Sequence, residues 1–121
     1  MNAIDLARQA YAPSPATLRS PRSIEAQLMA DVTHRLSRQD ASFPDLAAAV
    51  HANRQMWATL AVDVADPDNA LPPELRASIF YLAEFTDHQS RKYLRGEADL
   101  APLIEINSAV LRGLRGEGSP R

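Results

Sequence analysis

The chain of 121 residues contains no cysteine, and this absence removes three kinds of chemistry at once. Disulfide bridges, zinc sites built on thiolates and catalysis by a thiol all require cysteine. Aromatic residues are also few, at 6%, so the chain lacks an array of rings on which nucleic-acid bases could stack. The net charge of −2 argues against a general nucleic-acid binder, because such proteins are usually basic.

Long apolar runs and enzyme motifs are missing as well. No run approaches the roughly 20 apolar residues of a membrane-spanning helix, and the N-terminus does not resemble a secretory signal. We therefore expect a cytoplasmic protein that does not enter a membrane. The chain has no Gly-x-Ser-x-Gly, no Gly-rich phosphate loop and no His-Glu-x-x-His motif. We accordingly expect no enzyme activity, no cofactor and no bound metal.

What the chain does contain is helical periodicity, which nine prolines divide into segments. The pattern predicts an all-α fold in one domain, a small bundle of four main helices preceded by a short, detachable N-terminal helix. The expected organisation is an N-terminal helix and linker at 1–19, a bundle at 20–114 and a disordered tail at 115–121. Within the bundle, helices are expected from Ser20, from Ser42 to about Ala65, from Pro72 or Pro73 to Gly96, and from a cap at Asp99 to Leu114.

Each predicted helix carries an apolar stripe that should face the core. The stripe of the first bundle helix is Ile24, Leu28, Val32 and Leu36. The second has an alternating spacing of four and three residues, typical of helix bundles, in Leu46, Val50, Asn53, Trp57, Leu60 and Val64. The third is Leu75, Ile79, Leu82 and Thr86, and the fourth is Leu100, Ile104, Asn107, Leu111 and Leu114. Phe80, Tyr81 and Phe85 widen the third stripe, so we expect that helix to be covered on two sides.

Two asparagines, Asn53 and Asn107, interrupt otherwise apolar stripes. A buried amide is costly unless its donors and acceptors are satisfied. One hypothesis is that the two side chains bond neighbouring backbone groups or pair across the bundle and set its register. The other is that one of them faces a groove and bonds a partner. Trp57, the only tryptophan, is expected to anchor the packing, with partner contact as the alternative.

Charged side chains offer two further candidates. Arg54 is expected to form an ion pair with Asp63, Asp66 or Glu105, or else to contact a partner. A basic cluster of Arg91, Lys92 and Arg95 falls near a predicted helix end. The helix dipole explains such charges, and contact with RNA phosphate is the less favoured alternative.

The N-terminal segment is the best candidate for a moving part. A helix over residues 2–11 carries Ile4, Leu6 and Tyr11, which so short a helix cannot bury alone. We expect it to cover an apolar groove of the bundle and to be displaced by a partner helix, so that deleting residues 1–19 alters partner binding. The candidate partner-binding residues are Ile4, Leu6, Tyr11, Asn53, Arg54, Trp57 and Asn107.

These residues resemble those of a known family, the flagellar biosynthesis regulator FlaF of alphaproteobacteria. The resemblance rests on Asn53-Arg54-x-x-Trp57-x-x-Leu60, Asp63, Asn69-x-Leu71-Pro72-x-x-Leu75-Arg76 and Leu103-Ile104-Glu105-Ile106-Asn107. It covers about residues 43–113, and the segment from Ser20 to Glu25 is similar to the family's N-terminal part. The order and spacing of these elements in one short chain make the match specific.

The resemblance implies a cytoplasmic accessory protein of flagellum assembly. Members of the family are thought to act on flagellin as a secretion chaperone and positive regulator, in opposition to the flagellin translation repressor FlbT. The alternative function is a post-transcriptional regulator that contacts flagellin mRNA or another regulator such as FlbT. The family has no established catalytic or cofactor residues. The sequence leaves the oligomeric state, the interface and the bound end of flagellin open.

Overall fold

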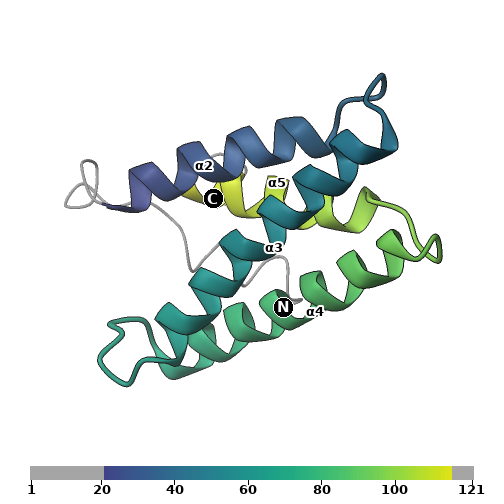
Figure 1. The fold of residues 1–121 in the computed structure, drawn as a ribbon. Helices are drawn as coiled ribbons and strands as arrows, with labels where there is room; N and C mark the ends of the chain where they lie inside the picture. The colour runs from purple at the N-terminus through teal and green to yellow at the C-terminus, as the bar shows by residue number, and fades with distance from the viewer. Residues whose placement is uncertain (1–20, 116–121) are drawn as a thin grey trace.

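The computed structural model describes the backbone of residues 21–115 and the side-chain surroundings of residues 26–113. This part of the chain forms four helices and no strand (Figure 1). They are α2 (Pro21–Leu36), α3 (Phe43–Ala65), α4 (Pro73–Leu94) and α5 (Ala101–Arg115). The all-α prediction is confirmed, and the predicted helix ends hold to within about two residues. The helix expected at 2–11, its linker and residues 116–121 of the tail expected at 115–121 lie outside the described residues, whereas Arg115 is the last residue of α5.

Helix α3 is the element that connects the two halves of the bundle. It packs along α4 over most of its length and also against α2, while α2 packs against α5. Helix α4 touches α5 over a much shorter stretch. In Figure 1, α3 crosses in front of α5, with α2 above and α4 below. One long face of the α3–α4 pair is therefore not used in packing against α2 or α5.

The start of α3 is set by a side-chain cap. The Ser42 hydroxyl accepts a hydrogen bond from the Asp45 backbone N–H at 3.2 Å. Asp45 also places a negative charge in the first turn, where the helix dipole favours it. Pro44 lies in the same turn, where a missing N–H removes no helical bond. This confirms the helix start that was predicted at Ser42.

The turn between α3 and α4 is held by the side chain of Asn69. Its Nδ2 donates to the Asp63 carbonyl at 3.0 Å, and its Oδ1 accepts from the Leu71 N–H at 2.9 Å. One amide group thus ties the last turn of α3 to the residues that lead into α4. Asparagine suits this position because its short side chain bonds local backbone groups readily.

Arg76 on α4 closes the same turn from the other side. Its Nε donates to the Val64 carbonyl at 2.8 Å and its Nη2 to the Asp66 carbonyl at 2.9 Å. Carbonyls at a helix C-terminus have no partner within the helix and carry the negative end of its dipole. A guanidinium is well suited to both, so Arg76 fixes how α4 leaves α3.

Helix α4 ends in a Schellman motif. The Gly96 N–H donates to the Tyr93 carbonyl at 2.9 Å, and the Glu97 N–H donates to the Lys92 carbonyl at 2.8 Å. Gly96 has a φ of 78°, which side chains other than glycine rarely adopt. The predicted C-terminal cap at Gly96 is therefore confirmed.

The buried core follows most of the predicted stripes, with one clear exception on α2. Val32 and Leu36 are buried, but Leu28 is 49% exposed and Met29 is buried in its place. The prediction was wrong because residues four positions apart advance about 40° around a helix. A stripe repeating strictly every four residues therefore rotates away from the core, whereas Met29, Val32 and Leu36 stay on one face.

Candidate functional site

A chain of hydrogen bonds runs through the centre of the bundle and uses three of the candidate residues. Trp57 Nε1 donates to Asn107 Oδ1 at 2.9 Å, and Asn107 Nδ2 donates to Asn53 Oδ1 at 2.8 Å. Asn53 and Asn107 are 0% exposed and Trp57 is 1% exposed. The structure therefore shows the pairing of the two asparagines across the bundle, and it gives none of the three a surface for a partner.

These hydrogen bonds connect helices whose backbones remain apart. No Cα of α3 lies within 8 Å of a Cα of α5, so side chains alone bridge the two helices. The Trp57 indole and the Asn107 amide span this distance with a directional bond. Asn53 Nδ2 is buried and has no hydrogen-bond partner among the described residues. The bridge fixes the register of α5 against α3, because any slip would break both bonds at once.

The exposed surface offers a different site, a groove of about 630 Å³ on the outer face of the α3–α4 pair. Both of its walls are helical ridges. The ridge on α3 consists of Arg54, Ala58 and Ala61. The ridge on α4 consists of Phe80, Glu84, Asp87 and Arg91, with Tyr81 and His88 beside it. Residues spaced by three and four positions share one face of a helix, so each ridge runs along its helix axis.

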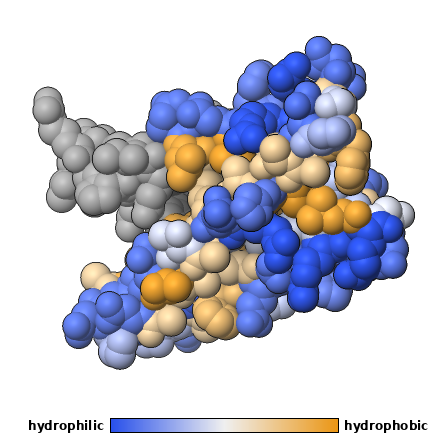
Figure 2. Space-filling model, viewed as in Figure 1, coloured by the Kyte–Doolittle hydropathy of each residue, from blue (hydrophilic) through white to orange (hydrophobic). Residues whose placement is uncertain are grey.

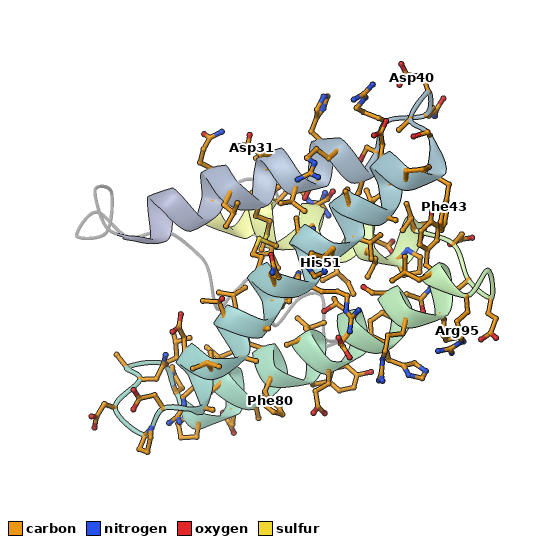
Figure 3. The ribbon with its side chains drawn as sticks, viewed as in Figure 1. Asp31, Asp40, Phe43, His51, Phe80 and Arg95 are labelled. Atoms are coloured by element: carbon orange, nitrogen blue, oxygen red, sulfur yellow. The ribbon has the colours of Figure 1, made fainter. Side chains whose placement is uncertain are left out.

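One end of the groove is apolar. Phe80 and Tyr81 are 40% and 57% exposed. Opposite them, the two alanines of the α3 ridge, Ala58 and Ala61, are too short to rise as a wall and form a low floor. Figure 3 labels Phe80 on α4, near the α3–α4 turn. Figure 2 shows apolar and weakly polar surface toward this turn and strongly hydrophilic surface toward the C-terminal end of α4. The expectation that α4 is covered on two sides was wrong for Phe80 and Tyr81, because no other described helix packs over them, whereas Phe85 packs against the core.

The other end of the groove is charged and centres on Asp87. Its Oδ1 accepts from Arg54 Nε and Nη2, both at 2.9 Å, and its Oδ2 contacts Arg91 Nε at 3.3 Å. One carboxylate thus lies between two guanidinium groups. The partners expected for Arg54 were Asp63, Asp66 and Glu105, and this expectation was wrong. Antiparallel packing of α4 places Asp87 beside Arg54, whereas even Asp63 lies about 13 Å further along α3.

The remaining candidates divide between described and undescribed parts of the chain. Ile4, Leu6 and Tyr11 lie outside the described residues. In the basic cluster, Arg95 Nη2 contacts Glu97 at 3.1 Å, so two of its three side chains form ion pairs. Between residues 26 and 113, no group of three or more histidine, aspartate and glutamate side chains is placed to hold a metal ion.

Sequence reasoning did not single out the groove itself. Ala58, Phe80, Tyr81 and Asp87 all line it, and none was among the candidate partner-binding residues. The available signal was the second apolar face on the segment that forms α4. That face was interpreted as core because periodicity does not reveal whether another helix covers a given stripe.

Comparison with known protein families finds one family that matches almost the whole chain. Residues 7–114 match the family described as flagellar protein FlaF. The chain belongs to this family. FlaF membership makes it a flagellar protein, and the resemblance drawn from the sequence is confirmed. No curated protein and no solved structure matches the chain significantly. Within the described part of the chain, no helix has the length and apolar character needed to cross a membrane.

The FlaF resemblance includes residues that the structure now explains. Asn69 and Arg76 hold the α3–α4 turn, while Asn53, Trp57 and Asn107 form the buried bridge. All five therefore support the fold. Arg54 differs from them, because its ion pair lies at the rim of the groove and its side chain is 31% exposed.

Proposed function

We propose that this FlaF-family protein binds flagellin in the cytoplasm and promotes its synthesis and secretion, as a chaperone and positive regulator. The observation that carries the proposal is the groove on the α3–α4 pair, where Phe80 and Tyr81 expose aromatic surface beside Ala58 and Ala61. Exposed apolar surface next to polar groups is typical of protein-interaction sites. Family membership supplies the flagellar context.

The physical chemistry of flagellin supports this role. Its terminal segments are amphipathic helices that pair only after assembly, so their apolar faces would self-associate in the cytoplasm. An apolar groove between two helices is a common receptor for one amphipathic helix. Binding of this kind requires no catalysis, cofactor or metal, and we propose that the protein is not an enzyme.

Direct binding to flagellin mRNA has less support from the charged groups. Arg95 forms an ion pair with Glu97, and the basic cluster belongs to a chain of net charge −2, which leaves little excess positive charge for phosphate. A regulator partner such as FlbT would require an interaction surface of the same kind as flagellin does. The experiment therefore has to separate these partners directly.

The test is size-exclusion chromatography with light scattering on purified protein mixed with monomeric flagellin. We expect a 1:1 complex at about 50 µM of each protein, a concentration at which even a modest helix–groove affinity is visible. An unrelated helical protein of similar size serves as the control. If flagellin and this protein elute separately, direct flagellin binding is not its main role. A complex with FlbT or salt-sensitive retention of the transcript would then identify the alternative partner.

A further inference from the structure

We propose that the α3–α4 groove receives a single amphipathic helix of about three turns, which places an apolar anchor beside Phe80 and Tyr81 and an acidic side chain beside Arg91. This inference rests on the proposed function and specifies its docking site. The occupant is defined by its chemistry: a helical segment with an apolar stripe and an acidic residue about ten positions from the apolar anchor.

The length of the occupant follows from the length of the groove. On α4, the lining residues extend from Phe80 to Arg91, which are eleven positions apart. Since an α-helix rises about 1.5 Å per residue, the groove is about 16 Å long. A helix lying along it contacts both ridges for about three turns. Only a few of its side chains can reach the groove, so the site recognises a short stripe.

The floor of the groove permits close approach of a helix backbone. Ala58 and Ala61 lie one turn apart on α3 and extend no further than a methyl group. Helices approach one another to about 8 Å only where the facing side chains are small. Phe80 and Tyr81 stand beside this floor with much of their surface exposed. An apolar side chain of the occupant would fit between the floor and the two rings.

The charges define the orientation of the occupant. Asp87 is shared by two guanidinium groups, and Arg91 contacts it at 3.3 Å with a side chain that is 55% exposed. This exposed guanidinium can therefore donate to a carboxylate at the rim of the groove. None of the lining residues at the apolar end carries a positive charge. An occupant helix with its acidic residue at the Arg91 end is favoured over the reverse orientation.

A second copy of this chain is a poor occupant for the same reason. Two copies related by a two-fold axis present the same surface to each other. If the grooves ran antiparallel, Phe80 and Tyr81 of one copy would face Arg91 of the other. If they ran parallel, the two Arg91 side chains would face one another. Neither arrangement matches apolar with apolar surface and acidic with basic groups simultaneously.

The experiment measures the affinity of full-length monomeric flagellin for the wild type and for two matched pairs of variants. Ala58→Gln fills the floor of the groove, and Ala48→Gln makes the same change at another exposed position of α3. Arg91→Gln removes the charge at the rim, and Arg35→Gln removes one from the exposed end of α2. Glutamine forms helices well, so all four variants should fold, as circular dichroism will verify.

We expect Ala58→Gln to raise the Kd about tenfold or more, because it occupies the position of the anchor. Arg91→Gln should raise it about threefold, with a smaller effect at high salt. Ala48→Gln and Arg35→Gln should bind as the wild type does. If wild type binds flagellin and Ala58→Gln binds equally well, the groove is not the docking site and the proposed function stands.

Three other results of this experiment would each overturn a different claim. If the wild type does not bind flagellin at all, the proposed function fails and the docking site fails with it. If the free protein is a dimer that Ala58→Gln converts into a monomer, a second copy occupies the groove and the inference is overturned. Equal loss of affinity in Ala58→Gln and Ala48→Gln would place the interface elsewhere on α3.

Discussion

Replacing Asn107 with leucine is expected to destabilise the protein far more than the same replacement at Asn53. Both asparagines are completely buried, so the two replacements match in burial and in the side chain introduced. They differ in position along the hydrogen-bonded chain. Asn107 stands in the middle, accepting from Trp57 and donating to Asn53, whereas Asn53 is at the end.

The magnitude follows from the polar atoms that each replacement leaves unpaired. In the Asn107→Leu variant, Trp57 Nε1 loses its acceptor and Asn53 Oδ1 loses its donor. Each newly unpaired buried group costs about 1–3 kcal/mol, so the expected loss is about 2–6 kcal/mol. Asn53→Leu leaves Asn107 Nδ2 unpaired but also removes Asn53 Nδ2, which already has no partner among the described residues. Its expected effect is therefore about 1 kcal/mol or less.

The double replacement gives the sharper expectation. With both asparagines gone, only Trp57 Nε1 remains unpaired in this chain of groups. The double variant should therefore be more stable than Asn107→Leu by about 2–6 kcal/mol, since two unpaired atoms of Asn53 have been removed. A total stability of about 5–15 kcal/mol is usual for a domain, so differences of this size are easy to measure.

Urea unfolding followed by far-UV circular dichroism measures the free energy of unfolding of all four proteins. If the free energy of unfolding falls with urea concentration at the same slope in all four proteins, their folded and unfolded states expose similar amounts of surface and can be compared directly. Trp57 fluorescence supplies a second probe, because this is the only tryptophan. Equal losses for the two single variants, or a double variant with the sum of both losses, would refute the role assigned to the buried bridge.

Two further predictions concern the ends of α3 and α4. Arg76→Gln should lower the free energy of unfolding by about 1–2 kcal/mol in urea titrations, because the Val64 and Asp66 carbonyls lose a charged donor. Arg35→Gln is its control, and an equal loss there would contradict the assignment. Gly96→Ala should lower the free energy of unfolding by about 1 kcal/mol. The whole effect should come from the φ of 78°, because an added Cβ meets no atom within 4 Å. A thermal unfolding midpoint that is unchanged would disprove this.

Local sequence signals predicted the helices and their ends well. Ser42 and Gly96 act through backbone geometry and hydrogen bonds within a few residues, so no distant contact is needed to recognise them. The seam through Val50, Trp57 and Leu60 is buried as expected. Its alternating spacing of four and three residues stays close to the 3.6 residues of a helical turn, whereas the stripe through Leu28 repeats strictly every four residues.

Partners of polar side chains were much harder to predict. Nothing near Arg54 in the sequence indicates that Asp87, 33 positions away, will be its partner. The same holds for Trp57 and Asn107, which are 50 positions apart. Asn53 and Asn107 could be recognised as unusual residues in apolar stripes, but their pairing depends on how α3 and α5 cross.

The sequence by itself determined the all-α class, the helix boundaries, most of the core and the family, because these follow from periodicity, caps and the order of motif residues. Only the tertiary structure decided which apolar face remains uncovered. Phe80 and Tyr81 have the same local pattern as core residues, and they are exposed because no other described helix packs there. The groove arises from the packing that α3 and α4 leave incomplete, and that is a property of the whole fold.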